Sequence, residues 1–204
     1  MADEDIPYKE FIVGDKTDLT RIDPTLRNVM IGVGWDVIGF DDQSPDLDVS
    51  VFLLDKNNQT RMDEDFIFYN NPSVMDGTVE HKGDNRTGAG DGDDEIINID
   101  LNKLPLDVLS VSFAISIHEA DLRDHSFKKN VRNGFFRIAS IDSDREMLRI
   151  KLDDMFVHDE KGKATAFVIG TLNRDGPLWS FEIVGKGAKN GLGEIATSYG
   201  IQIA

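Results

Sequence analysis

The sequence predicts a mainly β protein, an antiparallel two-sheet β-sandwich with one or two short helices and long acidic loops. In residues 108–118, large apolar residues alternate with small or polar ones, a period of two that is typical of a half-buried strand. Eight other short apolar segments occur at turn-punctuated spacing, as in antiparallel sandwiches. Strands do not alternate regularly with helices, which disfavours a parallel sheet.

The expected strands are separated by residues that favour turns, such as Asn71-Pro72 and Asp175-Gly-Pro177. Gly32 and Gly34 interrupt the first expected strand, which indicates a bulge or the close approach of another backbone. The nine expected strands are residues 28–35, 48–54, 65–70, 96–101, 108–118, 135–141, 147–152, 165–172 and 178–184.

Two segments have helical character: residues 119–130, with few apolar anchors, and residues 192–199, after a glycine-rich turn. Residues 70–95 form the longest expected loop. A stretch of that length without secondary structure is uncommon in a compact domain, and such loops are usually functional or disordered. This loop is therefore the first candidate for a functional site.

The 204 residues include 22 Lys or Arg, 38 Asp or Glu and no Cys, which gives a formal net charge of −16. Such acidity disfavours binding to nucleic-acid phosphates or bare anionic membranes, and favours cations or basic partners. The lack of thiols excludes disulfides and thiolate metal sites, and it fits a reducing compartment. No segment reaches the roughly 20 apolar residues of a membrane span, and the acidic start is unlike a secretory signal. We therefore expect a cytoplasmic protein.

The acidic charge is concentrated in residues 84–95, where five carboxylates accompany one arginine, Arg86. Asp46 and Asp48 lie two positions apart on an expected strand, so they share one face at a spacing of about 6.6 Å. Asp36 follows another expected strand. Each aspartate alone is more typical of a turn or of a solvated loop. Together they indicate a divalent-cation site made of oxygen ligands, which calcium prefers.

The acidic segment is not an EF-hand, although it spans twelve positions and ends in Glu95. Its third position is Arg86, and its sixth is Ala89 where an EF-hand loop needs glycine. No strong helices are predicted on either side. The spacing alone therefore does not assign individual ligands.

Motifs for catalysis are weaker than the acidic pattern. The HExxH, GxSxG and P-loop motifs do not occur in the sequence, and the glycines of residues 185–193 form no dinucleotide fingerprint. His118 ends an expected strand, where a hydrogen-bonded structural histidine is more common. The alternative to a non-catalytic module is a divalent-metal-dependent hydrolase that uses the same acidic cluster, with His118 as the general base.

Five stretches of the sequence together resemble a known family. In chain order they are residues 32–36 (GVGWD), 46–54 (DLDVSVFLL), 65–71 (DFIFYNN), 83–95 (GDNRTGAGDGDDE) and 131–135 (VRNGF). The chain is similar to the TerD family of tellurium-resistance and general stress proteins. The resemblance implies a β-sandwich that binds two calcium ions near one end and has no established catalytic activity. By motif position it implies calcium-binding roles for Asp36, Asp46, Asp48, Asn71, Asp84, Asn85, Gly88, Asp91, Asp93, Asp94 and Glu95.

The resemblance begins near residue 14, so we expect an N-terminal extension, residues 1–13, and a single TerD-like β-sandwich domain, residues 14–204. The implied function is a calcium-binding module of a tellurium-resistance and stress-response system. Such a module acts by calcium-dependent stabilisation or partner binding. Its expected partners are calcium ions and proteins of a stress-response complex. Any membrane association is expected through another subunit, because the acidic charge disfavours direct lipid binding unless calcium bridges the protein to anionic headgroups. We expect no binding to nucleic acid.

Overall fold

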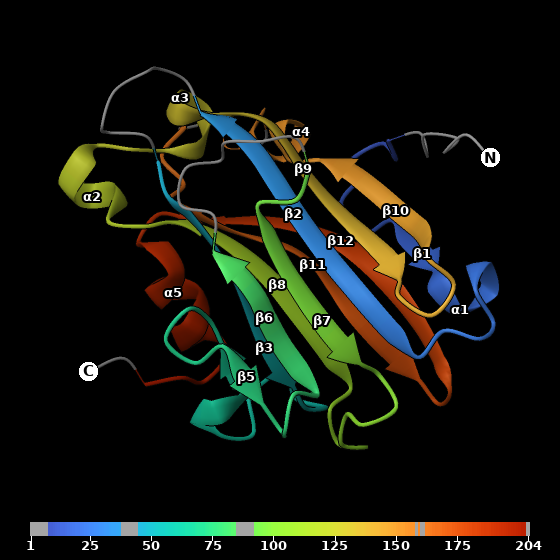
Figure 1. Cartoon of the computed structure of the whole chain (residues 1–204). Helices are drawn as coiled ribbons and strands as arrows, with labels where there is room; N and C mark the ends of the chain where they lie inside the picture. Colours follow the sequence, from blue (N-terminus) through green and yellow to red (C-terminus); the bar gives the residue numbers. More distant parts are fainter. Residues whose placement is uncertain (1–7, 38–44, 85–91, 158, 160–161, 203–204) are drawn as a thin grey trace.

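Two six-stranded antiparallel sheets are stacked face to face in the computed structural model, which describes residues 8–37, 45–84, 92–157, 159 and 162–202 (Figure 1). The β8 sheet has the order β1 (Lys16–Asp18), β12 (Leu178–Ala188), β11 (Ala166–Asp175), β8 (Ser110–Ile117), β3 (Leu47–Leu54) and β4 (Phe66–Ile67). The β2 sheet has the order β10 (Arg145–Lys151), β9 (Val131–Ser140), β2 (Asn28–Val37), β7 (Glu95–Asp100), β6 (Val79–Asp84) and β5 (Ser73–Val74). The predicted fold class is confirmed.

All nine expected strands are present, and β1, β5 and β6 are additional. The expectation that residues 70–95 lack secondary structure is wrong where β5 and β6 lie. In β6 the core-facing positions belong to Val79 and His81, which pair in register with Ile99 and Ile97 of β7. A histidine at a core-facing position hides the apolar alternation that would reveal the strand.

The helices are short. The expected helix at residues 192–199 is α5 (Gly191–Ser198), and the one at 119–130 is split into α2 (Ala120–Arg123) and α3 (Phe127–Asn130). The others are α1 (Leu19–Ile22), α4 (Leu152–Val157) and the 3-10 turn η1 (Asp63–Asp65). In the described part of the chain, no helix is long and apolar enough to cross a membrane.

Helix α5 covers the outer face of the β8 sheet, so all eight residues of β8 are buried and the prediction of a half-buried strand is wrong. The covered face carries small side chains, and the Ser112 hydroxyl lies 2.9 Å from the Tyr199 hydroxyl at the end of α5. Phe52 and Ile195 belong to the apolar cluster under the helix. Serine and alanine resemble solvent-facing residues in the sequence, although here they give the helix room to pack.

The main core lies between the sheets. Phe113 of β8 meets Phe136 of β9 at 5.7 Å between ring centroids, and Phe136 stacks on Phe181 of β12 at 5.2 Å. Burying each such ring stabilises the fold by about 1.5–3 kcal/mol relative to an exposed ring. These contacts fix the two sheets against each other and so fix the strand ends that carry the acidic segments.

Arg174 of β11 organises the loop between β7 and β8. Its guanidinium donates hydrogen bonds to four backbone carbonyls, those of Leu101, Leu104, Pro105 and Val108, at 2.8–3.3 Å. It also lies over the Trp179 ring, 4.8 Å from the centroid. One side chain thus adds a donor to four loop carbonyls, of which that of Pro105 also accepts from the Val108 amide.

Candidate metal centre

The acidic segments of the sequence meet at one end of the sandwich. Strand β2 ends there at Val37 and β6 at Asp84, while β3 begins at Leu47 and β7 at Glu95. Figure 1 shows the end of β2 next to α3 at its upper left, with the end of β6 and the start of β7 below it, nearer the centre of the view. The antiparallel order β2-β7-β6 requires this arrangement within one sheet, and sheet stacking brings the start of β3 to the same end.

The stem of the acidic segment is bonded to β2. The Asp94 amide donates to the Val33 carbonyl at 2.8 Å, and the Trp35 amide donates to Asp94 Oδ2 at 2.9 Å. Both Asp94 and the Trp35 side chain are buried. Asp36 follows Trp35 and is exposed, and its Oδ2 accepts a 2.7 Å hydrogen bond from Asn133 Nδ2. Both aspartates are thereby held next to Trp35: Asp94 by the Trp35 backbone amide, and Asp36 as the next residue of β2, bound to Asn133.

Asp93 lies over Gly32 on the outer face of the β2 sheet. A Cβ at position 32 would lie 2.5 Å from Asp93 Cγ, so only glycine leaves space for the carboxylate. The close backbone approach predicted from the glycine pair occurs at Gly34, where a Cβ would lie 2.5 Å from the Gly92 carbonyl oxygen, and the predicted bulge is the register shift between Gly34 and Asp36.

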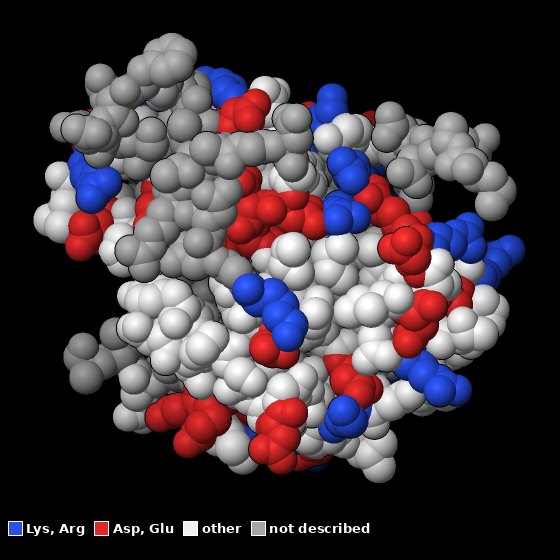
Figure 2. Space-filling view, viewed as in Figure 1, with Lys and Arg blue, Asp and Glu red and all other residues white. Residues whose placement is uncertain are grey.

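Arg137 of β9 binds both oxygens of Asp93, with Nε–Oδ1 at 2.7 Å and Nη2–Oδ2 at 2.5 Å. Its third nitrogen, Nη1, reaches Glu146 Oε2 at 3.1 Å. The hydrogen bonds with Asp93 raise the pKa of Arg137 above its usual value despite its burial. Glu146 in turn binds Arg149, at 2.7 Å in both contacts. Figure 2 shows such carboxylates and cations side by side across the upper part of this face.

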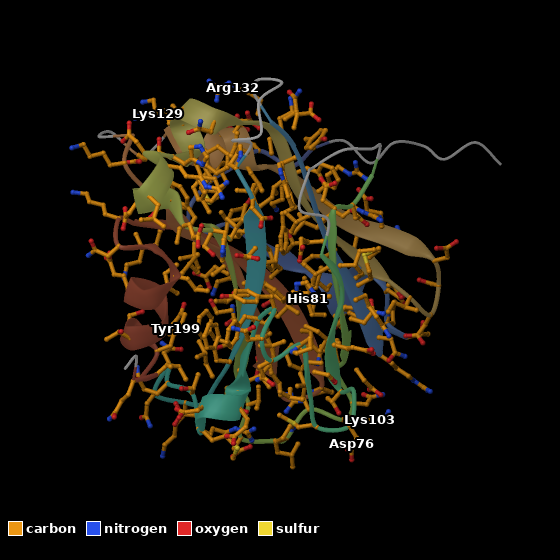
Figure 3. All side chains as sticks on the ribbon, turned by 60° about the vertical axis from the view of Figure 1, so that its left-hand side comes forward. Asp76, His81, Lys103, Lys129, Arg132 and Tyr199 are labelled. Carbon is orange, nitrogen blue, oxygen red and sulfur yellow. The ribbon has the colours of Figure 1, made fainter. Side chains whose placement is uncertain are left out.

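Two histidines accompany carboxylates at this end. His81 Nε2 lies 2.5 Å from Glu95 Oε2, and both side chains are almost fully buried between the sheets. Figure 3 shows His81 within the body of the molecule. On the β8 sheet, His118 Nδ1 lies 3.5 Å from Asp48 Oδ2, and the Tyr69 ring meets the His118 ring edge-on at 5.9 Å.

The remaining predicted ligands are placed as follows. The Asp46 carbonyl accepts a hydrogen bond from the His118 amide at 2.8 Å. The side-chain Nδ2 of Asn71 donates to the Phe66 carbonyl at 2.8 Å, within its own turn. Asp84 pairs with Glu95 in the β6–β7 ladder. Asn85, Gly88 and Asp91 lie outside the described residues.

Comparison with known proteins gives the family. The family model for the TerD domain matches residues 10–199. This chain belongs to the TerD family. It is 41% identical over 188 residues to tellurium resistance protein TerD of Serratia marcescens, covering 92% of this chain and 95% of the relative. It is also 41% identical over 191 residues to general stress protein 16U of Bacillus subtilis (strain 168), covering 93% and 96%.

A solved structure shares the TerD-family fold. It is a homologue of telluride resistance protein (TerD) from Streptomyces coelicolor A3(2), with a TM-score of 0.66. The match covers 84% of this chain and 95% of that chain at 21% identity. At that identity the likeness concerns the fold alone.

The donors at this end have the chemistry that calcium prefers, because they are carboxylate and carbonyl oxygens. Within the residues that the structure describes, however, no group of three or more His, Asp or Glu side chains is arranged to hold a metal ion. Several of the predicted ligands already bind protein groups: Asp93 binds Arg137, Glu95 binds His81 and Asp48 lies beside His118. A cation at these residues would compete with Arg137 and with both histidines.

The sequence predicts no role at this end for His81, Asn133 or the Trp35 amide. For Asn133 the only indication is its place in the stretch 131–135, which carries the family resemblance. For His81 there is none, because only the folded structure brings its side chain against that of Glu95.

Proposed function

We propose that this chain is a calcium-binding module of a tellurium-resistance and stress-response system. The observation that carries the proposal is the meeting of the acidic stem, Asp93 to Glu95, with Asp36 and with the start of β3 at one end of the sandwich. The assignment to a tellurium-resistance and stress-response system is supported by the names of two relatives, tellurium resistance protein TerD and general stress protein 16U. We place the module in the cytoplasm, with two calcium ions and with protein partners of a stress-response complex.

The ligand set of this proposal is the predicted one, of which Asp36, Asp46, Asp48, Asn71, Asp84, Asp93, Asp94 and Glu95 lie in the described part of the chain. A bound calcium ion would supply positive charge among carboxylates that otherwise repel one another. Binding to the folded state alone stabilises it by RT ln(1 + [Ca²⁺]/Kd), about 2.7 kcal/mol at a hundredfold excess over Kd. The module then acts through this stabilisation or through a partner that recognises the occupied end.

Calcium titration by calorimetry, together with thermal melting in calcium and in a chelator, tests the proposal. Asp48→Asn and Asp94→Asn should each weaken calcium binding, because each removes a negative charge from the acidic end. Asp144→Asn is the matched control: Asp144 is exposed in the β9–β10 turn and has a left-handed backbone that asparagine adopts readily. No heat of binding and an unchanged melting temperature would reject calcium binding, and equal effects of all three variants would reject the ligand set.

Calcium could be a permanent structural ion or a switch, and the affinity separates these roles. An ion that stays bound at resting cytosolic calcium levels is structural, whereas one that binds only during calcium influx regulates. Partner capture from cell extract with calcium and with chelator gives the functional answer. Partner capture that does not depend on calcium would leave the ion a structural role alone.

A divalent-metal-dependent hydrolase is the second candidate, because His118 is partly exposed and lies 3.5 Å from Asp48. One pocket in the described region, about 170 Å³, is lined by residues that include Phe167 and Lys189, and it contains none of the predicted site residues. It is also smaller than usual ligand pockets, which occupy about 300–1,000 Å³. Phosphodiester turnover that is lost in His118→Ala would favour the enzyme, and full turnover in that variant would reject His118 as the base.

A further inference from the structure

The segment that follows β8 at the candidate metal end has a charge opposite to that of the whole protein. Residues 122–132 (LRDHSFKKNVR) contain four cations and one acid, Asp124, whereas the chain carries −16. The segment includes the end of α2 and all of α3, directly follows the acids Glu119 and Asp121, and has exposed cationic side chains. Figure 3 shows Lys129 and Arg132 at the end of the molecule opposite to Lys103 and Asp76.

Contacts draw a fifth cation into this group. The Lys128 side chain packs against Gly162, where a Cβ would lie 3.0 Å from Lys128 Cδ, so the exposed Lys163 is a near neighbour. Arg132 Nη1 donates to the Lys128 carbonyl at 3.0 Å. We call the five cations the basic corner: Arg123, Lys128, Lys129, Arg132 and Lys163.

Only part of this charge is neutralised by nearby acids. Lys129 Nζ binds Asp124 Oδ2 at 2.7 Å, and Arg123 lies 3.7 Å from Glu119. Lys128 and Lys163 form no ion pair with a carboxylate among the residues that the structure describes, and the Arg132 hydrogen bonds go to backbone carbonyls. The basic corner therefore presents cations that remain available to an external anion.

An exposed leucine completes the corner. Leu122 of α2 is 80% exposed and lies directly before Arg123. Left-handed backbone at Glu119 and Asp124 brackets α2, which Figure 1 shows outside the two stacked sheets. An apolar side chain among cations on a projecting turn has the chemistry of an interfacial anchor, in which the apolar group enters the headgroup region and the cations contact lipid phosphates.

We propose that the basic corner docks on an anionic lipid bilayer, with Leu122 in the headgroup region. A bilayer fits better than a nucleic acid, because a bilayer offers apolar depth for Leu122 and contacts only this end of an otherwise acidic molecule. The calcium dependence of docking rests on the proposed function: ions at the neighbouring acidic segment reduce its repulsion of the same surface. Direct docking replaces our expectation that a membrane is reached through another subunit.

Co-sedimentation with vesicles tests the proposal, using phosphatidylcholine alone or mixed with phosphatidylglycerol, in calcium and in chelator. The wild-type protein should bind the mixed vesicles and not the neutral ones, and calcium should strengthen binding. The double variant Lys128→Glu with Lys163→Glu should bind at least tenfold more weakly, since each basic residue near an anionic surface contributes about fivefold. Leu122→Ser should also weaken binding severalfold.

The matched control is Lys103→Glu, an exposed charge reversal at the opposite end of the molecule. It should bind vesicles within about twofold of wild type. Equal losses in Lys103→Glu and in the single variant Lys128→Glu, which change the net charge by the same amount, would overturn the proposal, because net charge alone would then govern binding. The proposal would also be overturned if the wild-type protein did not bind mixed vesicles in the presence of calcium, or if it bound nucleic acid through the same residues instead.

Calorimetry on the same variants separates this proposal from the calcium proposal. The basic-corner variants should keep wild-type calcium affinity and a wild-type melting temperature. Wild-type protein that binds calcium but no vesicles overturns docking alone. Protein that binds no calcium, but binds mixed vesicles through the basic corner equally well in chelator, overturns the calcium proposal and keeps docking.

Discussion

Gly32 lies beneath the Asp93 carboxylate, so one added methyl group at position 32 tests how the acidic stem is held. In Gly32→Ala the new Cβ would lie 2.5 Å from Asp93 Cγ and 2.6 Å from Oδ2. Ordinary contacts between such atoms are about 3.5–4.0 Å. The carboxylate must therefore move by about 1 Å, which breaks its paired hydrogen bonds with Arg137.

The size of the effect follows from the burial of this pair. The Asp93 side chain is 5% exposed and that of Arg137 is 22% exposed. Disrupting a buried ion pair costs about 3–5 kcal/mol, and we expect about 2–3 kcal/mol here because Arg137 keeps Glu146 and some solvent. Alanine recovers about 0.5–1 kcal/mol over glycine within a strand. The net loss is about 2 kcal/mol, or a melting temperature lower by about 4–8 °C in a protein of this size.

The assay is urea unfolding and calorimetric melting of wild type, Gly32→Ala, Asp93→Ala and the double variant. If the methyl group acts by displacing Asp93, it should cost little once the carboxylate is gone, which gives a coupling energy of about 1–2 kcal/mol. Additivity of the two changes within about 0.5 kcal/mol would refute the reasoning. A Gly32→Ala variant with the same melting temperature as the wild type would also refute the reasoning.

Three further predictions concern stability. Arg174→Met should lower the free energy of unfolding by about 3 kcal/mol, because four loop carbonyls lose the Arg174 donor and, among the described residues, only that of Pro105 keeps another, the Val108 amide; Arg132→Met should cost under about 1 kcal/mol, and equal losses in urea unfolding would contradict this. Tyr199→Phe should cost about 1 kcal/mol by removing the contact with the Ser112 hydroxyl, and unchanged urea unfolding would dismiss that contact. Hydrogen bonds from Thr25 and two serine hydroxyls hold the pKa of Asp23 below the usual aspartate value of 3.8, so the stabilisation from this carboxylate is full above pH 3.8 and is lost as the pH falls further. Asp23→Asn should therefore destabilise more at pH 7 than near pH 2, as measured by urea unfolding at both, and a constant difference would exclude this linkage.

The two-sheet architecture was predictable because, in most strands, the buried positions show in the sequence as apolar residues at every second position. Strand β6 was not, since His81 occupies a core-facing position and is neutralised there by Glu95, a partner distant in sequence. Strand β8 was assigned one solvent-facing side because serine and alanine look like surface residues. Only the position of α5, which no local pattern gives, shows that this side is covered.

In the candidate site, too, some features could be predicted from the sequence and others required the folded structure. Antiparallel pairing by itself brings the ends of β2 and β6 beside the start of β7, so their grouping could be expected. The pairing of Asp93 with Arg137 required the register of three strands, because Gly32 pairs with Ile96 on one side and with Arg137 on the other. In a chain this acidic, arginines are expected to pair with carboxylates. Arg137 does so with Asp93 and Glu146, whereas Arg132 donates to backbone carbonyls.

Strand β1, made early in synthesis, pairs with β12, which is made near the end of synthesis. At about 5–20 residues per second of synthesis, β1 waits roughly 10–30 s for its partner. All strands of the β2 sheet are made before β11 and β12, so its apolar inner face is complete while half of the opposing sheet is still missing. A chain released before β12 is made would leave part of that apolar face uncovered. Completion of β11 and β12 therefore removes a surface through which partly synthesised chains can aggregate.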